Sequence, residues 1–307
     1  MSATRDHRFI LVTRKTRLQE LIERFNTWPQ ARFYLEHNHV DAQDYLQEHD
    51  LYRKRINDVE LLLRSLGLFQ QLERNFLPSY QFGPNDIVVV VGQDGLVANT
   101  LKYLNGQPVI GINPDPDRWD GKLLPFEVGD LASVVGKTIN GSDDRKKVTF
   151  AEAVTNLGQR MLAVNDLFIG PKTHTSARYK IRWAEQSELH SSSGIIVSTG
   201  FGSTGWFQSI LAGAMGVAGT DSHPMSSGFS WADKKLQFAV REPFPSQNTG
   251  VQIVFGEITG SRTLKLESHM PEYGVIFSDG IEADAIPFNS GCIAEIKVSE
   301  TEGVLVC

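Results

Sequence analysis

Cysteine is scarce in this sequence, with only Cys292 and the last residue, Cys307, present. Two cysteines placed in this way form neither a disulfide framework nor a metal-binding knuckle, and they fit a reducing cytoplasm. Cys292 is interpreted as a small hydrophobic residue of a late strand. The sequence therefore predicts no structural disulfide, and we assign no metal-binding residues.

Long apolar runs are also absent. The longest, Ile87–Val91, is far shorter than the roughly 20 residues that a membrane-spanning helix needs. Phe9–Val12 is too short for the core of a signal peptide, and only eight residues precede it, which leaves no room for a transit peptide. We therefore expect a cytoplasmic protein that makes no membrane contact.

An excess of positive charge is missing too. The chain carries 30 basic and 36 acidic residues, for a net charge of −6, and Arg145–Lys147 and Lys234-Lys235 are basic clusters beside turn-like residues that are most simply solvated. Such a chain repels a polyanion, so nucleic acid is not an expected partner. Hydrophobic residues at 41% and charged residues at 21% are ordinary for a globular protein, and 307 residues suffice for two packed domains.

The N-terminal part alternates predicted strands with predicted helices. The run Ile87–Val91 does not alternate polar and apolar residues, so both faces of this strand should be buried, as in a parallel sheet. Strand, glycine-rich turn, helix and strand then follow one another to residue 113, as in a βαβ unit. The other expected elements are a strand at Phe9–Thr13 and helices at Arg17–Asn26 and Asp41–Leu66, the latter capped by Asp41. Residues 1–140 should therefore form an α/β domain with a parallel sheet.

Beyond residue 140 the sequence changes to short predicted strands separated by Gly, Pro, Ser or Asn. Many short strands with turn residues between them are typical of a sandwich-like antiparallel domain. The expected strands are Ala177–Trp183, Gly194–Ser198, Leu236–Val240, Val251–Phe255, Leu264–Glu267, Gly274–Ser278 and Ile293–Val298, with one helix at Trp206–Gly216. We expect a β-rich domain at residues 141–290 and a C-terminal segment, residues 291–307, that packs back on the N-terminal domain.

A glycine-rich loop, Gly92-Gln93-Asp94-Gly95, follows the buried strand and precedes a predicted helix. Glycines there let the backbone approach a phosphate, and the following helix directs its N–H groups and positive dipole end at it. Asp94 would repel such a ligand, unless it takes a proton from an attacking hydroxyl or holds magnesium. The alternative is that Asp94 only caps the helix. The loop lacks the Gly-x-Gly-x-x-Gly pattern of a dinucleotide-binding fingerprint.

Two further polar clusters interrupt the β-rich part. Gly200–Gly205 precedes a helix that starts at Trp206, and it offers backbone donors, the hydroxyls of Ser203 and Thr204 and an aromatic ring. These groups suit a nucleobase, whereas the alternative is a tight turn with Trp206 in the core. Asn165-Asp166 lies within the apolar run Met161–Ile169, where buried polar groups without partners would be costly. The pair could bind the vicinal hydroxyls of a ribose, or it could close a turn of its own.

Taken in order along the chain, five motifs resemble those of the NAD kinase family. They are Gly92–Gly95, Ile112-Asn113, Asn165-Asp166, Gly202-Ser203-Thr204 and Asp279-Gly280. Each motif is short, but their order and spacing extend the resemblance over nearly the whole chain. Asn113–Arg118 and Lys15-Thr16-Arg17 are most similar to the mitochondrial-type branch and its bacterial relatives.

This resemblance implies a kinase that transfers a phosphate from ATP, or from polyphosphate, to the 2′-hydroxyl of the adenosine ribose of NAD or NADH. Asp94 would be the catalytic base, and Asn165, Asp166 and Ser203 would hold the dinucleotide. Thr204 would contact the adenine, with Trp206 near that base. The remaining expected nucleotide-binding residues are Gly92, Gln93, Gly95 and Asn113. The resemblance also implies Mg²⁺ or another divalent cation, a site between two domains, and a homodimer or higher homo-oligomer.

Three positions depart from the family pattern. Gln93 stands where the family loop has its second glycine, Ser193 where many members carry an aspartate toward the nicotinamide half, and Pro114-Asp115-Pro116 where a Gly-rich segment is common. Gln93 places a side chain where the backbone should approach a phosphate, so a non-catalytic NAD(P)-binding sensor of the same fold is an alternative. A related kinase acting on another hydroxyl acceptor is a third hypothesis, disfavoured by the Asn-Asp and Gly-Ser-Thr motifs.

Overall fold

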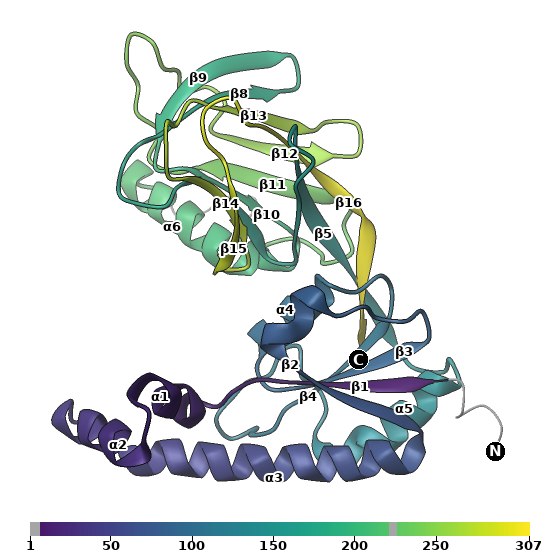
Figure 1. Cartoon of the computed structure of the whole chain (residues 1–307). Coiled ribbons are helices and arrows are strands. Elements are labelled where there is room, and N and C mark those ends of the chain that lie inside the picture. Colours follow the sequence, from purple (N-terminus) through teal and green to yellow (C-terminus); the bar gives the residue numbers. More distant parts are fainter. Residues whose placement is uncertain (1–6, 221–225) are drawn as a thin grey trace. The chain divides into compact units, whose positions relative to one another are not determined.

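The computed structural model describes residues 7–220 and 226–307 and divides into two compact units. Unit 1 ends at Arg145 and also includes Val304–Cys307, whereas unit 2 comprises Lys146–Gly303. Figure 1 colours both units along the chain. Strand β16 (Ile293–Val306) contributes residues to both, because the division falls within it.

Unit 1 is built on a parallel sheet. Its strands lie in the order β2, β1, β3, β4, followed by the last residues of β16. All six residues of β3 are buried, as the unbroken apolar run predicted. The strands are β1 Arg8–Thr13, β2 Leu68–Glu73, β3 Asp86–Val91 and β4 Pro108–Ile112. The predicted α/β domain with a parallel sheet is therefore confirmed.

Helices cover both faces of this sheet. On one face, a core that includes Val59, Leu63 and Val135 joins α3 and α5 to the strands, and α4 lies on the other face (Figure 1). The helices of unit 1 are α1 Arg17–Phe25, α2 Trp28–His37, α3 Ala42–Leu66, α4 Asp94–Leu101 and α5 Leu131–Ile139, with short 3₁₀ turns at Arg74–Ser79 and Val128–Asp130. These helices position the end of β3, where the glycine-rich loop begins.

Local signals explain which of these helices the sequence reveals. Asp41 caps α3 as predicted, because its carboxylate accepts the backbone N–H of Gln43 at 2.8 Å. Helix α2 was not predicted. The side chain of its N-cap, Thr27, accepts no backbone N–H of the helix and bonds only the Gln30 side chain, and only Ala31 and Leu35 are buried, so neither a backbone cap nor a clear apolar stripe marks it.

Unit 2 contains two antiparallel arrays of strands. One sheet has the order β12, β11, β10, β7, β14, β15. The other array joins β9, β8, β13 and β16, with β5 and β6 paired beside β16. The strands are β5 Arg145–Thr155, β6 Arg160–Ala163, β7 Asp166–Pro171, β8 Ala177–Trp183, β9 Gln186–Ser192, β10 Ile195–Ser198, β11 Lys235–Val240, β12 Phe255–Thr259, β13 Leu264–Ser268, β14 Gly274–Ser278 and β15 Ile281–Pro287. The predicted β-rich domain is confirmed.

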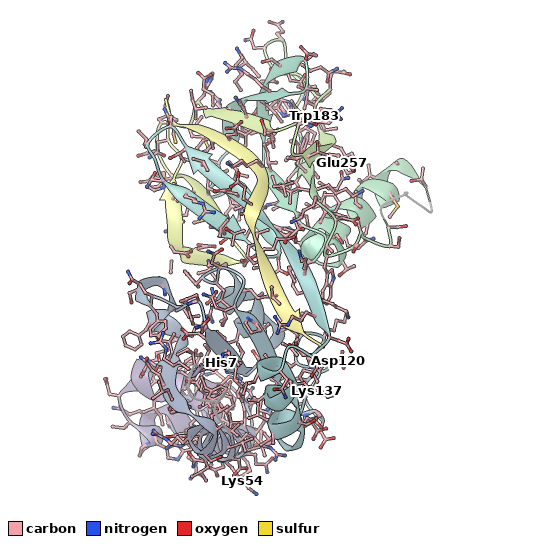
Figure 2. The ribbon with its side chains drawn as sticks, turned by 90° about the vertical axis from the view of Figure 1, so that its right-hand side faces the viewer. His7, Lys54, Asp120, Lys137, Trp183 and Glu257 are labelled. Atoms are coloured by element: carbon pink, nitrogen blue, oxygen red, sulfur yellow. The ribbon has the colours of Figure 1, made fainter. Side chains whose placement is uncertain are left out.

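The two arrays share one core, and the second face of the six-stranded sheet is covered separately. Ile169, Ile181 and Phe238 belong to the shared core. The indole N–H of Trp183 donates to the backbone carbonyl of Glu257 at 3.0 Å, which links β8 to β12 (Figure 2). On the opposite face of β7, β10 and β11, helix α6 (Trp206–Ala218) packs through Phe207 and Leu211 against Phe168, Ile196 and Ala239. The candidate site of unit 2 lies on this second face.

One predicted strand is wrong. The chain forms no strand at Val251–Val254, and β12 begins only at Phe255. The backbone N–H groups of Gln252 and Ile253 instead donate to the Glu188 carboxylate at 2.9 and 2.6 Å. These donors are therefore not available to a neighbouring strand. The apolar pattern alone could not reveal an acceptor that lies about 65 residues earlier in the chain.

Candidate functional site

The loop Gly92-Gln93-Asp94-Gly95 joins β3 to α4 at the carboxyl edge of the parallel sheet. Gly92 is buried, and a Cβ at this position would meet Leu96 Cδ2 at 2.8 Å, so a larger residue would require the Leu96 side chain to move. Gly95 is exposed, with open space around it. Gln93 occupies the N-cap position in extended backbone and is half-buried, but its side chain does not bond the helix. The first N–H groups of α4 are therefore left without a side-chain cap from Gln93.

Asp94 does not cap its own helix, because it is the first residue inside α4. Its carboxylate instead accepts the backbone N–H of Leu123 at 2.9 Å and that of Lys122 at 3.3 Å. The capping interpretation is therefore wrong. The carboxylate joins the glycine-rich loop to the segment that follows β4, and its remaining lone pairs can still accept a proton or a further hydrogen bond.

The Asn113 side chain stabilises the segment that follows β4. Its side-chain amide donates to the Trp119 carbonyl at 2.8 Å, and its side-chain oxygen accepts the N–H of Asp115 at 3.1 Å. Asn113 is also buried, so its visible role is to shape the loop that reaches Asp94. The loop lies so close to β4 that a Cβ on Gly111 would come within 2.1 Å of the Leu123 carbonyl oxygen.

A network of ion pairs ties the same loop to α3. Arg118 donates to Asp44 at 2.6 Å, lies 3.3 Å from Asp115, and approaches Glu48 at 3.8 Å. Glu48 also accepts from Arg14 at 3.0 Å and pairs with Arg17. The Glu48 side chain is only 6% exposed, so its burial without these partners would be costly.

In unit 2, Asn165-Asp166 lies at the start of β7 and is held by the late Asp-Gly motif. The Asp279 carboxylate accepts the backbone N–H of Asn165 at 2.6 Å and that of Val164 at 3.1 Å. In return, the backbone N–H of Asp279 donates to the Asp166 carbonyl at 2.9 Å. Asp279 has a φ of 56°, a left-handed conformation that Asp tolerates better than most residues. Two motifs more than 110 residues apart thus form one local structure.

Asp166 is buried and its side chain is incompletely satisfied. Only 8% of the residue is exposed, and Oδ1 has no hydrogen-bond partner among the described residues. Burial raises the pKa of Asp166 to about 7, the nearby Ser198 hydroxyl opposes this rise, and the Asp279 carboxylate adds to it. Ser198 lies opposite both Asp166 and Gln237 in the sheet register. Gln237 also has a buried side-chain oxygen without a partner, so two acceptors here are left without protein donors.

The Gly202-Ser203-Thr204 turn lies against Asn165. A Cβ on Gly202 would come within 2.3 Å of the Asn165 carbonyl oxygen, so only glycine allows this approach. The buried Ser203 hydroxyl donates to the Gly200 carbonyl at 2.7 Å and accepts the Phe229 N–H at 3.1 Å. Thr204 is exposed, and 36% of Trp206 is exposed. Ser203 therefore fixes the turn, whereas Thr204 and Trp206 are available to a ligand.

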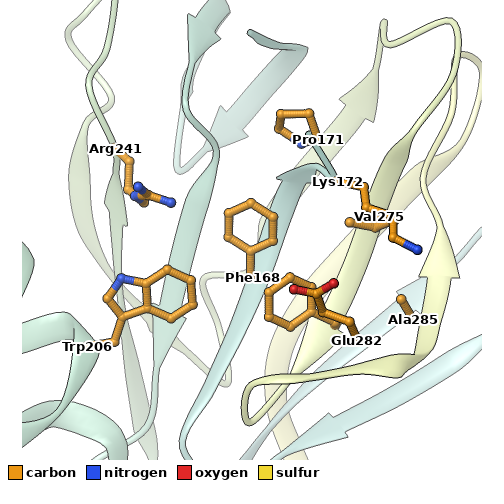
Figure 3. A pocket seen from close by; sticks show the side chains of 9 residues that line it. Phe168, Pro171, Lys172, Trp206, Arg241, Val275, Glu282 and Ala285 are labelled. Atoms are coloured by element: carbon orange, nitrogen blue, oxygen red, sulfur yellow. The ribbon is translucent and has the colours of Figure 1, made fainter. Parts of the chain in front are cut away.

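Trp206 borders a cavity of about 170 Å³ on the same face of unit 2 (Figure 3). Its ring is nearly parallel to that of Phe168, with an interplanar angle of 10° and centroids 5.8 Å apart. The Arg241 guanidinium lies 5.5 Å from the Trp206 ring centroid. Lys172 and Glu282 lie on the other side of Phe168 in Figure 3. The cavity therefore offers aromatic surfaces together with charged groups of both signs, which suits a polar heteroaromatic ring.

Two glycines leave room for the Phe168 ring, which lines this cavity. A Cβ on Gly170 would meet Phe168 Cζ at 2.7 Å, and one on Gly194 would meet Phe168 Cε2 at 2.9 Å. Gly194 also has a φ of 104°, which favours glycine. The Phe168 ring therefore packs against the backbone at two positions where any side chain would collide with it.

No protein-family model matches the chain. An NAD kinase of Chlorobium phaeobacteroides (strain BS1) is 32% identical over 126 residues, which cover 39% of this chain and 43% of that protein. The chain thus aligns with less than half the length of this curated relative.

Two solved structures are similar over almost the whole chain. A crystal structure of an NAD kinase from Archaeoglobus fulgidus in complex with ATP has a TM-score of 0.60 at 17% identity, covering 98% of this chain and 93% of that one. Yeast NADH kinase complexed with NADH has a TM-score of 0.59 at 13% identity, covering 98% and 83%. The fold is that of NAD kinases. The resemblance to NAD kinases is therefore confirmed at the level of the fold.

In this NAD-kinase fold, the predicted site residues form two clusters, one in each unit. Unit 1 brings together the Gly92–Gly95 loop with Asp94 and, through the loop after β4, Asn113. Unit 2 brings together Asn165, Asp166 and the Ser203 turn. Sequence reasoning missed Phe168 and Arg241. Phe168 could have been found, because it lies two residues after Asp166 in a strand and so faces the same side.

A metal site built from several side chains is not visible in the described ranges. No group of three or more His, Cys, Asp or Glu side chains within residues 7–220 and 226–307 is arranged to hold a metal ion. Magnesium in kinase sites is commonly held by one or two carboxylates together with substrate phosphates and water. Of the predicted site residues in unit 1, Asp94 has the oxygen ligands that suit this role.

No helix in the described part of the chain is long and apolar enough to cross a membrane.

Proposed function

We propose that this protein is an NAD kinase, which transfers the γ-phosphoryl group of ATP to the 2′-hydroxyl of the adenosine ribose of NAD or NADH. The observation that carries the proposal is the buried, unpartnered Oδ1 of Asp166 beside the Gly-Ser-Thr turn. A buried acceptor without a donor is costly unless a ligand supplies the donor. A ribose hydroxyl is such a donor, and the fold is one found in kinases that act on NAD or NADH.

We assign the dinucleotide to the unit 2 cluster. Asn165 and Asp166 would bind ribose hydroxyls, Ser203 would keep the turn in place, and Thr204 would contact the adenine. Trp206 would offer its exposed ring to the base, and the adjoining cavity is large enough for one aromatic ring system. The contribution of Arg241 would be a positive charge near the bound nucleotide.

We assign the phosphoryl transfer to the unit 1 cluster. The 2′-hydroxyl oxygen would attack the γ-phosphorus, the bond from that phosphorus to the β–γ bridging oxygen would break, and ADP would leave with the electron pair. Asp94 would accept the hydroxyl proton. Gly92, Gly95 and the first N–H groups of α4 would lie along the phosphates, with Gln93 and Asn113 shaping the loops around them. Magnesium would neutralise phosphate charge when bound, and Asp94 is the residue of this cluster that could contact it.

The direct test is formation of NADP or NADPH by the purified protein with ATP, magnesium and either NAD or NADH. We expect turnover with at least one of the two acceptors. Calorimetry should show that Asn165→Ala and Thr204→Ala weaken dinucleotide binding, each by about fivefold, as the loss of a hydrogen bond of about 1 kcal/mol predicts. Unchanged affinity in both variants would place the dinucleotide elsewhere.

A non-catalytic NAD(P) sensor is the second candidate, and Gln93 favours it. The half-buried Gln93 side chain follows Gly92 directly and makes no cap hydrogen bond to the start of α4, so it occupies space beside the loop backbone. If Gln93 blocks the donor, wild type should bind NAD without turnover, and Gln93→Gly should gain activity. Turnover by wild type that Gln93→Gly does not increase would rule the sensor out.

We also propose, from the resemblance, that the protein forms a homodimer or a higher homo-oligomer. Light scattering during size-exclusion chromatography tests this directly. A monomer at micromolar concentration would contradict it.

A further inference from the structure

An exposed lysine lies beside the Asp94 carboxylate. The backbone N–H of Lys122 donates to Asp94 Oδ2 at 3.3 Å, and the Lys122 side chain is exposed. We propose that the Lys122 ammonium binds the triphosphate chain of the phosphate donor next to Asp94. This inference rests on the proposed kinase function and adds a residue that binds the donor.

Three features of the backbone hold Lys122 at this place. Gly121 has a φ of 58°, which turns the chain just before Lys122. A Cβ on Gly121 would come within 2.5 Å of the Asn113 side-chain nitrogen, so the turn also depends on close packing. Leu123, the next residue, is fixed by its own N–H bond to Asp94 and by its approach to Gly111. Lys122 is therefore held between two anchored neighbours, and only its side chain is free to move.

The charges on the same loop distinguish Lys122 from Arg118. Arg118 is occupied by Asp44, Asp115 and Glu48, so it serves the structure of the loop. Lys122 makes no ion pair with any residue in the described ranges. An unpaired ammonium on a flexible stem is well suited to bind a phosphate as a point charge.

The chemistry of the site favours a cationic side chain in addition to magnesium. The Asp94 carboxylate repels the phosphates that must come near it, and the glycine-rich loop supplies only neutral N–H donors. A lysine beside the carboxylate offsets this repulsion and favours the negative charge that spreads over the phosphoryl oxygens during transfer. Because Lys122 holds Asp94 through its backbone, a change of its side chain leaves that hydrogen bond in place.

The test compares Lys122→Met, Lys122→Arg and wild type, with Lys54→Met as the control. Lys54 is an exposed lysine of α3 (Figure 2). Calorimetry would measure the binding of ATP, inorganic triphosphate and NAD by each protein, and steady-state assays would give KM for ATP. In Lys122→Met, we expect ATP and triphosphate to bind about tenfold more weakly, with a matching rise in KM for ATP. NAD binding should be unchanged, Lys122→Arg should keep most of the affinity, and the control should match wild type.

Equal affinities for triphosphate in Lys122→Met, Lys54→Met and wild type would overturn the inference. A loss of NAD affinity equal to the loss of ATP affinity would also overturn it, since Lys122 would then act on the fold as a whole. Failure of the proposed function has a different signature. In that case wild type would form no NADP(H), while triphosphate binding would still depend on Lys122.

Discussion

At the scale of single residues, Asp166 has the environment furthest from that of an ordinary aspartate. Its pKa of about 7 in the folded protein lies well above the usual 3.8, chiefly because of burial. Below the lower value both folded and unfolded chains are protonated. Between the two values the folded state holds the proton more tightly, so the free energy of unfolding falls as pH rises, and the loss is complete above about pH 7.

We therefore predict that Asp166→Asn removes this dependence on pH. Wild type should lose stability relative to the variant between about pH 4 and pH 7, by an amount on the order of a few kcal/mol, and the difference should then stay constant. Urea unfolding of both proteins at closely spaced pH values measures this. If the free energies of unfolding of the two proteins change with pH in parallel across this range, Asp166 does not carry the shifted proton.

Asp94 gives the second prediction at this scale. Asp94→Asn keeps the size of the side chain and one acceptor oxygen for the Leu123 N–H, gives up the longer bond from the Lys122 N–H, and cannot accept a proton from substrate. We expect kcat to fall by about 10²- to 10⁴-fold, while NAD affinity changes little. Asp50→Asn, at an exposed position of α3, is the matched control and should keep full activity.

The readouts for Asp94→Asn are NADP(H) formation and the unfolding midpoint. A variant with normal turnover would refute the role of general base. A variant that loses turnover and stability together would instead indicate that the carboxylate serves mainly to hold the 121–124 segment.

Sequence reasoning at the residue scale found candidates but not their partners. Asp94, Asn165, Asp166 and Ser203 were singled out because polar residues beside glycines or within apolar runs need an explanation. The bonds that hold them come from far along the chain: Asp279 reaches Asn165 from 114 residues away. No local pattern encodes such a bond, so the acceptor of the Asn165 N–H could not be predicted.

At the scale of elements, the clearest dependence is that of the loop after β4 on helix α3. Glu48 of α3 accepts from Arg14 and pairs with Arg17, and it also lies near Arg118. We predict that Glu48→Gln destabilises the protein by about 1–3 kcal/mol, because it removes a charge partner from both Arg14 and Arg17 inside the unit. The part of this cost that falls on the half-exposed Arg17 is screened by solvent.

The control for Glu48→Gln is Glu36→Gln on α2. Glu36 pairs with Arg32 at 2.7 Å, but the two side chains are 54% and 60% exposed. An exposed pair of this kind contributes less than about 1 kcal/mol, so the control should unfold close to wild type. Urea unfolding measures both variants, and equal midpoints would show that the α3 network adds nothing to stability.

The elements themselves were predictable to the extent that their signals are local. Strand β3 and helix α3 were found, because an unbroken apolar run and a capped amphipathic stretch are both visible within one window. Helix α2 has neither signal and was missed. The strand predicted from Val251 is the opposite case, because a signal was present but no strand forms before Phe255. Its apolar residues predicted strand pairing, whereas the N–H groups of Gln252 and Ile253 bond the Glu188 carboxylate.

At the scale of the whole molecule, the predicted fold class is correct because each unit carries its own periodicity. Buried parallel strands alternate with helices in unit 1, and short antiparallel strands fill unit 2. The two clusters of candidate residues also separate by unit. A ligand that binds one cluster should therefore slow amide hydrogen exchange in that cluster more than in the other.

We predict that NAD and ATP slow hydrogen exchange in different segments. NAD alone should protect amides around Asn165–Asp166 and Thr199–Ser203, whereas ATP with magnesium should protect Gly92–Gly95 and Lys122-Leu123. A ligand at 100 times its Kd adds about 2.7 kcal/mol to any opening that releases it, which is roughly a 100-fold slower exchange. Mass spectrometry of peptides from the free protein and from each complex measures this. Gln252-Ile253, whose N–H groups bond Glu188, serve as an internal reference that neither ligand should change. Protection of the Gly92–Gly95 loop by NAD alone, with none at Asn165–Asp166, would contradict the assignment of the dinucleotide to unit 2.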